Sequence, residues 1–91
     1  MGSSAERPGR TETRVSEQEY RDRLRELPPS AKLVAKVLEG GEGLSQARVA
    51  EETLLPDRTV RYALTRLEEA ELVSARHNLQ DARKQLYSLT R

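Results

Sequence analysis

The sequence predicts a small α+β domain, in which a helical core is followed by a β-hairpin that belongs to a small antiparallel sheet. Up to Glu71, apolar residues recur at three- and four-residue spacing, which is the period of amphipathic helices. After Glu71, the short runs "LVSA" and "QLYSLT" are rich in β-prone residues. Proline or glycine interrupts the helical part at three places, so we expect four separate helices.

Composition limits the class of protein. The 91 residues suffice for one small domain, and the lack of Phe and Trp leaves Leu, Val and Ala to form its core. The lack of cysteine excludes disulfides and thiolate metal sites. No apolar run is long enough to span a bilayer, so we expect no membrane association and a cytoplasmic location. Residues 1–14 are polar and predict a disordered tail, which leaves 15–91 for the domain.

The first helix is expected at about 16–27. Ser16 and Glu19 have the spacing of a capping box. Tyr20, Leu24 and Leu27 then form a narrow apolar stripe, and the prolines at 28–29 end the helix. This stripe is either a seal on the core of the domain or the seam of a dimer.

Two more helices are expected at about 31–39 and 46–53. Ser30 is predicted to cap the second, whose broad apolar face includes Leu33 and Val34, and two glycines at 40–41 end it. Ser45 is predicted to cap the third. A short strand at Leu44 would complete a three-stranded sheet with the hairpin.

The fourth helix, at about 57–70, has two opposite faces. One is apolar and predicts burial; its members are Val60, Ala63, Leu64, Leu67 and Ala70. The other holds Arg58, Arg61, Tyr62, Thr65 and Arg66, and no acidic residue joins it before Glu69. Arginine near a helix amino terminus opposes the helix dipole, so Arg58 and Arg61 lie where they help helix stability least. Guanidinium and hydroxyl groups on one helix face suit the major groove of DNA.

The hairpin is expected at about 72–90, with a long polar tip, "RHNLQDARK". Arg76 and Lys84 flank this tip and are candidates for contacts with phosphates. His77 is the single histidine of the chain and lacks the partners that metal binding or catalysis needs, so we expect an exposed residue of the hairpin.

Helix, tight turn, helix and basic hairpin together form the winged helix-turn-helix arrangement. The segment "LSQARVAEETLLPDRTVRYALTRLEEAELV", followed by "DARKQLYSLT", resembles the DNA-binding core of the MarR-type regulators over about residues 30–90. The matching motifs are Thr59-Val60, Leu67-Glu68, Asp81 with Arg83, and Leu89-Thr90.

The resemblance implies a role for individual residues. Arg58, Thr59, Arg61, Tyr62 and Arg66 would contact DNA from the helix, and Arg83 would enter the minor groove from the wing, oriented by Asp81. The chain departs from the family pattern at three points: Glu71 replaces a usual glycine, Pro56 replaces a serine so that Asp57 is expected to cap the helix, and the long terminal dimerisation helices are missing. We therefore expect residues 16–27 to serve in a homodimer.

Two functions remain open at this stage. The first is a sequence-specific transcriptional regulator that binds double-stranded DNA. The second is a winged-helix module that binds proteins within a larger complex. No glycine-rich phosphate loop, carboxylate pair or nucleophile setting is present, so we expect neither an enzyme nor a cofactor. We also expect no small-molecule effector, because so small a domain leaves little room for a pocket.

Overall fold

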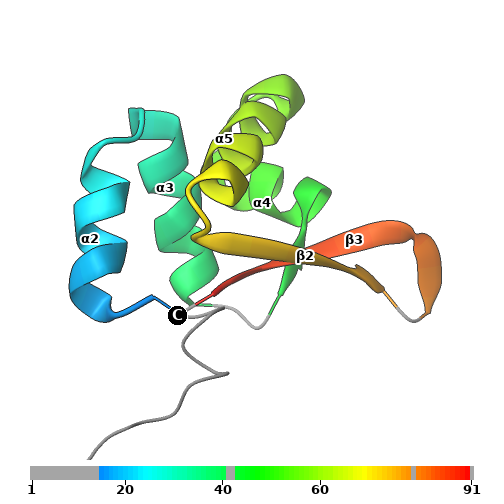
Figure 1. Cartoon of the computed structure of the whole chain (residues 1–91). Coiled ribbons are helices and arrows are strands. Elements are labelled where there is room, and N and C mark those ends of the chain that lie inside the picture. Colours follow the sequence, from blue (N-terminus) through cyan, green and yellow to red (C-terminus); the bar gives the residue numbers. More distant parts are fainter. Residues whose placement is uncertain (1–14, 41–42, 79, 91) are drawn as a thin grey trace, which may run out of the picture.

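The computed structural model of the protein describes residues 15–40, 43–78 and 80–90, without the side chains of residues 78 and 81–83. The tail expected at 1–14 lies outside this part. The described helices are α2 (Glu17–Arg25), α3 (Pro29–Glu39), α4 (Gln46–Thr53) and α5 (Asp57–Glu69). The described strands are β1 (Leu44–Ser45), β2 (Val73–Asn78) and β3 (Asp81–Leu89). The β2–β3 ribbon extends beyond the helices on the side away from α2 (Figure 1).

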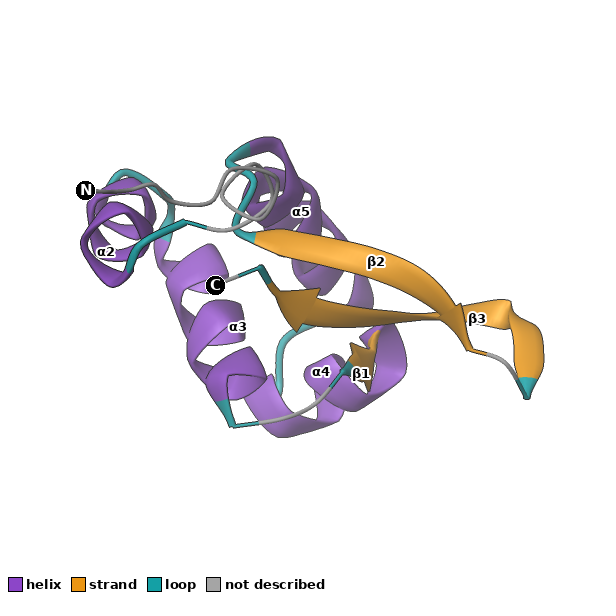
Figure 2. Ribbon diagram, turned by 60° about the horizontal axis from the view of Figure 1, so that its bottom comes forward, coloured by secondary structure: helices purple, strands orange, loops and turns teal. Residues whose placement is uncertain are grey.

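The three strands form one antiparallel sheet in the order β1-β3-β2. Leu44 lies opposite Tyr87, and Val73 lies opposite Leu89. Figure 2 shows β3 between the longer β2 and the short β1. The three-stranded sheet predicted from the sequence is therefore confirmed.

The long polar tip predicted for the hairpin is wrong. Arg76 and His77 belong to β2, and Lys84 belongs to β3. The pairs pass from His77–Gln85 directly to Asn78–Asp81, so the register shifts by three residues and residues 82–84 bulge from the ladder. Backbone pairing extends strands through polar residues that the side-chain pattern assigns to a loop.

Helix starts follow the capping prediction at two of four places. Ser16 accepts a hydrogen bond from the Glu19 backbone in a complete capping box, and Ser45 accepts one from the Arg48 backbone. The caps expected at Ser30 and Asp57 are wrong. Pro28 and Pro56 occupy the N-cap positions, and α3 and α5 begin at the residue that follows each proline.

The two prolines have extended backbones at the N-cap positions and make no side-chain capping bond. In α3 a further proline, Pro29, occupies the first helical position, where a backbone N–H would have no helical partner. Asp57 becomes the first residue of α5, where its negative charge still favours the helix dipole.

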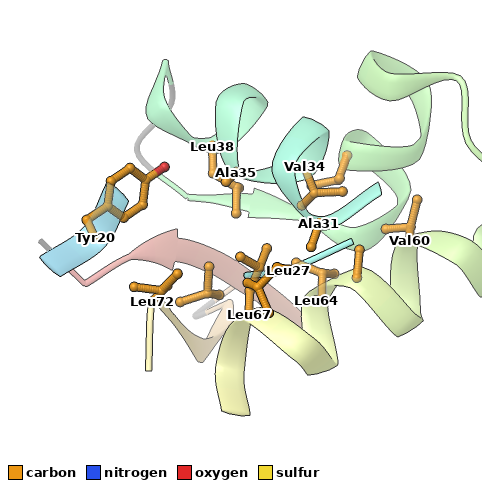
Figure 3. Packing of buried hydrophobic residues seen from close by; sticks show 13 residues of the cluster. Tyr20, Leu27, Ala31, Val34, Ala35, Leu38, Val60, Leu64, Leu67 and Leu72 are labelled. Atoms are coloured by element: carbon orange, nitrogen blue, oxygen red, sulfur yellow. The ribbon is translucent and has the colours of Figure 1, made fainter. Parts of the chain in front are cut away.

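The core lies between α3, α5 and the base of the sheet. Figure 3 shows Leu27, Leu64 and Leu67 lying together among the buried side chains. Tyr20 is buried and Leu24 packs against the same cluster, so the stripe on α2 seals the core of its own chain. This answers the question that the sequence left open, because these side chains are occupied inside the domain.

The carboxyl end of α5 is held by contacts from distant parts of the chain. Glu71, just after the helix, has a left-handed φ of 63°, the conformation that a glycine adopts without strain. Its carbonyl accepts a hydrogen bond from the Thr90 hydroxyl at 2.8 Å. Arg23 of α2 donates from Nη1 to the Ala70 carbonyl at 2.8 Å and lies 3.5 Å from the Glu71 carboxylate. Residues from the first described helix and from the segment after β3 therefore both contact the carboxyl end of α5.

Candidate nucleic-acid interface

The outward face of α5 is the first component of the candidate interface. Its inner face is buried, as predicted, through Val60, Ala63, Leu64 and Leu67. On the other face Arg58, Arg61 and Thr65 are exposed, and Tyr62 is 49% exposed. Thr59 is partly buried at the start of the helix. The amino-terminal end of α5 points away from α2, to the same side as the β2–β3 ribbon (Figure 1).

The three arginines of this face differ in their surroundings. Within the described part of the chain, Arg58 and Arg61 make no side-chain hydrogen bond or ion pair. Arg66, in contrast, donates from Nη1 to the Tyr62 hydroxyl at 2.8 Å, and its Nε lies 3.8 Å from the Glu69 carboxylate. Its guanidinium carbon is 5.8 Å from the centre of the Tyr62 ring. The face therefore offers two unpaired cations and one cation that is already engaged.

This engagement of Arg66 was not predicted from the sequence. Tyr62 and Arg66 are four residues apart, and Glu69 follows three residues later, which are the spacings at which side chains meet on a helix. That signal was available, and it would have separated Arg66 from Arg58 and Arg61.

The base of the β2–β3 ribbon adjoins the face at Tyr87 of β3. Burial raises the pKa of the Tyr87 phenol above its usual value; the Glu68 carboxylate adds to the rise, and the Arg61 guanidinium opposes it. Both α5 side chains are therefore close enough to act on this phenol. Arg61 consequently lies on the side of α5 that faces the ribbon.

The basic residues of the ribbon do not gather in one place. Arg76 and Tyr87 belong to neighbouring cross-strand pairs, so their side chains point to opposite faces of the sheet. The Arg76 guanidinium lies over Gly43, 3.8 Å from the position that a Cβ would take there. Lys84 is exposed and, together with Ser45, Gln46 and Gln85, lines a hollow of about 290 Å³ beside the start of α4. The side chains of Asp81 and Arg83 lie outside the described part.

A second hollow, of about 350 Å³, lies between α2 and α3. Tyr20, Leu24, Lys32 and Lys36 are among the residues that line it. This volume is at the lower end of the range for small-ligand pockets. Domain size alone is therefore not a sufficient reason to expect no effector.

Other kinds of site find no support in the described residues. His77 is exposed on β2, and no group of three His, Asp or Glu side chains in the described ranges is placed to hold a metal ion. None of the helices described here is both long and apolar enough to cross a membrane.

Comparisons with known proteins were made for sequence and for structure. No protein-family model and no curated protein sequence matches the chain. Solved structures do match. The S. aureus MepR–DNA complex has a TM-score of 0.68 at 23% identity, over 81% of this chain and 63% of that chain. The PcaV transcriptional regulator from Streptomyces coelicolor, in complex with its natural ligand, has a TM-score of 0.68 at 28% identity. The match covers 89% of this chain and 52% of PcaV.

A zinc-responsive MarR family member, Lactococcus lactis ZitR, matches with a TM-score of 0.65 at 31% identity. The match covers 71% of this chain and 44% of ZitR. The domain has the winged helix-turn-helix fold of these MarR-type proteins. In this MarR-type domain α4 and α5 form the helix-turn-helix, and the β2–β3 ribbon is the wing. The chain spans between 44% and 63% of the lengths of these three proteins.

Proposed function

We propose that the protein is a transcriptional regulator that binds double-stranded DNA in a sequence-specific manner. The observation that carries the proposal is the outward face of α5, where Arg58 and Arg61 are exposed and have no acidic partner among the described residues. A recognition helix in the major groove needs such unpaired donors, because a guanidinium already held by a carboxylate must lose that partner before it binds DNA.

The comparisons support this reading of the fold. The MepR structure is a complex with DNA, and PcaV is a transcriptional regulator. The description of PcaV as a transcriptional regulator agrees with a non-enzymatic role.

Within this proposal most of the candidate residues have a stated task. Arg61 reads a base in the major groove, and Arg58 contacts a phosphate or a base nearby. Thr59 and Thr65 offer hydroxyl groups to phosphates. Lys84 contacts a phosphate beside the start of α4. The resemblance alone assigns Arg83 to the minor groove and Asp81 to its orientation. Arg76 is not assigned a contact, since it lies on the opposite face of the wing from Tyr87.

The test is a titration of the protein with duplex DNA over a series of salt concentrations. Four phosphate or groove contacts, from Arg58, Arg61, Arg83 and Lys84, predict a slope of log K against log salt of about −3.6 per domain. Arg58→Ala should reduce the magnitude of this slope by about one. Arg25→Ala, which removes the same charge from α2, should leave it unchanged.

A slope near zero, or no binding at low salt, would contradict the DNA-binding proposal. The winged-helix module that binds proteins would then be the better interpretation. The Arg25 variant should bind DNA with the salt slope of the wild-type protein. This result would show that the change in slope for Arg58→Ala depends on the position of the lost charge.

We also propose a homodimer, because two winged helices related by two-fold symmetry make twice the contact with DNA that one makes. If residues 16–27 form its interface, Leu24 is the apolar side chain of the α2 stripe that remains partly exposed for it, since Tyr20 and Leu27 belong to the core. Sedimentation equilibrium would measure the mass: two chains support this proposal, and one chain at high protein concentration contradicts it.

A further inference from the structure

The pair formed by Tyr62 and Arg66 has a direction that follows from its chemistry. A guanidinium carries donors and no acceptor, so in the 2.8 Å contact the Tyr62 oxygen accepts the hydrogen bond. The phenol retains its own O–H, which needs an acceptor elsewhere. Within the described part of the chain the only partner of the Tyr62 hydroxyl is Arg66, and the side chain is 49% exposed. Its hydrogen is therefore available to an acceptor outside the protein.

Arg66 is held in place from two sides. It lies between the Tyr62 hydroxyl and the Glu69 carboxylate, at 2.8 Å and 3.8 Å, and it packs near the Tyr62 ring. The carboxylate offsets part of its charge, so Arg66 attracts a phosphate less than Arg58 and Arg61 do. A phenol that accepts a hydrogen bond from a cation becomes a stronger donor. The arrangement weakens Arg66 as a DNA ligand and strengthens Tyr62.

We propose that Tyr62 donates its phenolic hydrogen to a phosphate oxygen of DNA and that Arg66 is a positioning residue, which fixes the ring and directs that hydrogen outward. This inference rests on the proposed DNA binding and changes the role of Arg66, which the sequence resemblance assigned to DNA. Tyr62 then adds an uncharged phosphate contact, whose loss should not change the number of released counterions.

A double-mutant cycle on the full chain tests the proposal. Tyr62→Phe removes the hydroxyl and keeps the ring. Arg66→Met together with Glu69→Gln removes the guanidinium and its carboxylate, so the net charge of the face stays the same. The third protein carries all three changes. Duplex affinities and salt slopes are measured for all of them, and melting temperatures establish that each variant is folded.

Tyr62→Phe should weaken binding by about 3- to 10-fold, the range for one hydrogen bond, without changing the salt slope. The Arg66→Met, Glu69→Gln protein should lose a similar or smaller factor. The triple variant should bind no more weakly than Tyr62→Phe, because Arg66 acts through the hydroxyl that is already absent. Similar losses for a specific and a random duplex identify the acceptor as a phosphate.

Three results would overturn the proposal. Losses that multiply in the triple variant would show that Arg66 acts independently of Tyr62. An unchanged affinity of Tyr62→Phe would show that the hydroxyl makes no contact. A loss confined to the specific duplex would assign the hydrogen to a base edge instead of a phosphate. If the wild-type protein does not bind duplex DNA, the proposed function itself fails, and this outcome is seen before any variant is compared.

Discussion

Leu54 and Glu71 share a left-handed backbone conformation, with φ of 63° at both positions. A side chain with a Cβ is strained there by about 1–2 kcal/mol. Leu54 ends α4 and is 89% exposed, so no packing of its side chain offsets the strain. Glu71 differs because its carboxylate lies 3.5 Å from Arg23. The same backbone strain is therefore accompanied by a compensating contact at one position and not at the other.

Leu54→Gly is expected to stabilise the domain. The relief of strain exceeds the added flexibility of glycine in the unfolded chain, for a net gain of about 0.5–1 kcal/mol and a rise in melting temperature of roughly 3–6 °C. Thermal unfolding followed by circular dichroism measures it. Leu33 provides the control, because it is also an exposed leucine, at 42%, but lies within α3. Leu33→Gly should lower the melting temperature, and a decrease for Leu54→Gly as well would contradict the strain at Leu54.

Glu71→Gly is expected to gain less than Leu54→Gly. Glycine relieves the same strain, but the ion pair with Arg23 is lost, and an exposed pair of this kind contributes about 0–1 kcal/mol. Glu71→Gln separates the two effects, since it removes the charge and keeps the strain. We expect a slightly lower melting temperature for Gln than for Glu and a higher one for Gly. A Gly variant less stable than the Gln variant would show that the backbone is not strained at this position.

Among the elements, α2 contacts the end of α5 through a hydrogen bond that the sequence of α2 does not predict. The Nη1 of Arg23 donates to the Ala70 carbonyl, one of the carbonyls left without a helical partner at the end of α5. Its positive charge also lies at the negative end of the α5 dipole. Arg23 thus caps α5 from another helix, at the end of α5 that lies away from Arg58 and Arg61.

Arg23→Met is expected to destabilise the domain by about 1.5 kcal/mol, because a charged hydrogen bond to a carbonyl is lost, and to lower the melting temperature by roughly 6–10 °C. Arg21→Met is the matched control on the same helix. Arg21 has an exposed ion pair with Glu17 at 4.0 Å, so its removal should have little effect. Equal melting temperatures for the two variants would contradict the capping role of Arg23.

The elements that the sequence predicts well are those fixed by local contacts. The capping box at Ser16 and the buried face of α5 depend on residues three or four positions apart, and both patterns are visible in the chain. The contact of Arg23 with Ala70 spans 47 residues. The position of the Arg76 side chain over Gly43 depends on how the strands pair in the sheet. Such contacts follow from packing and not from spacing. The strands at residues 76–78 and 81–84 were missed for the same reason, since pairing and not side-chain pattern defines them.

For the molecule as a whole, the helix and the wing should contribute differently to DNA recognition. Arg61 lies on the exposed face of α5, where a guanidinium that binds a guanine edge discriminates by about 1–3 kcal/mol against the wrong base. Arg61→Ala should therefore weaken binding to the preferred site more than binding to random DNA. Arg83→Ala should weaken both by similar factors and reduce the salt slope by about one. Competition binding with the two duplexes measures both quantities.

Asp81→Ala extends this comparison, because it should reproduce part of the Arg83 loss if the carboxylate orients that guanidinium. Arg25→Ala on α2 serves as the control for the removal of a positive charge. An unchanged ratio of specific to random binding in Arg61→Ala would show that other residues read the bases.

The position of β3 in the middle of the sheet has a consequence for synthesis on the ribosome. β1 has its partner in β3, and Leu44 must wait for Tyr87, 43 residues later in the chain. At about 5–20 residues per second, this takes roughly 2–9 s. α4, α5 and β2 are translated within that interval, so all four described helices have their sequence complete before β3 does, whereas both outer strands still lack the strand that joins them. Until β3 is translated, β1 and β2 have unpaired edges, and β3 closes the sheet on both sides.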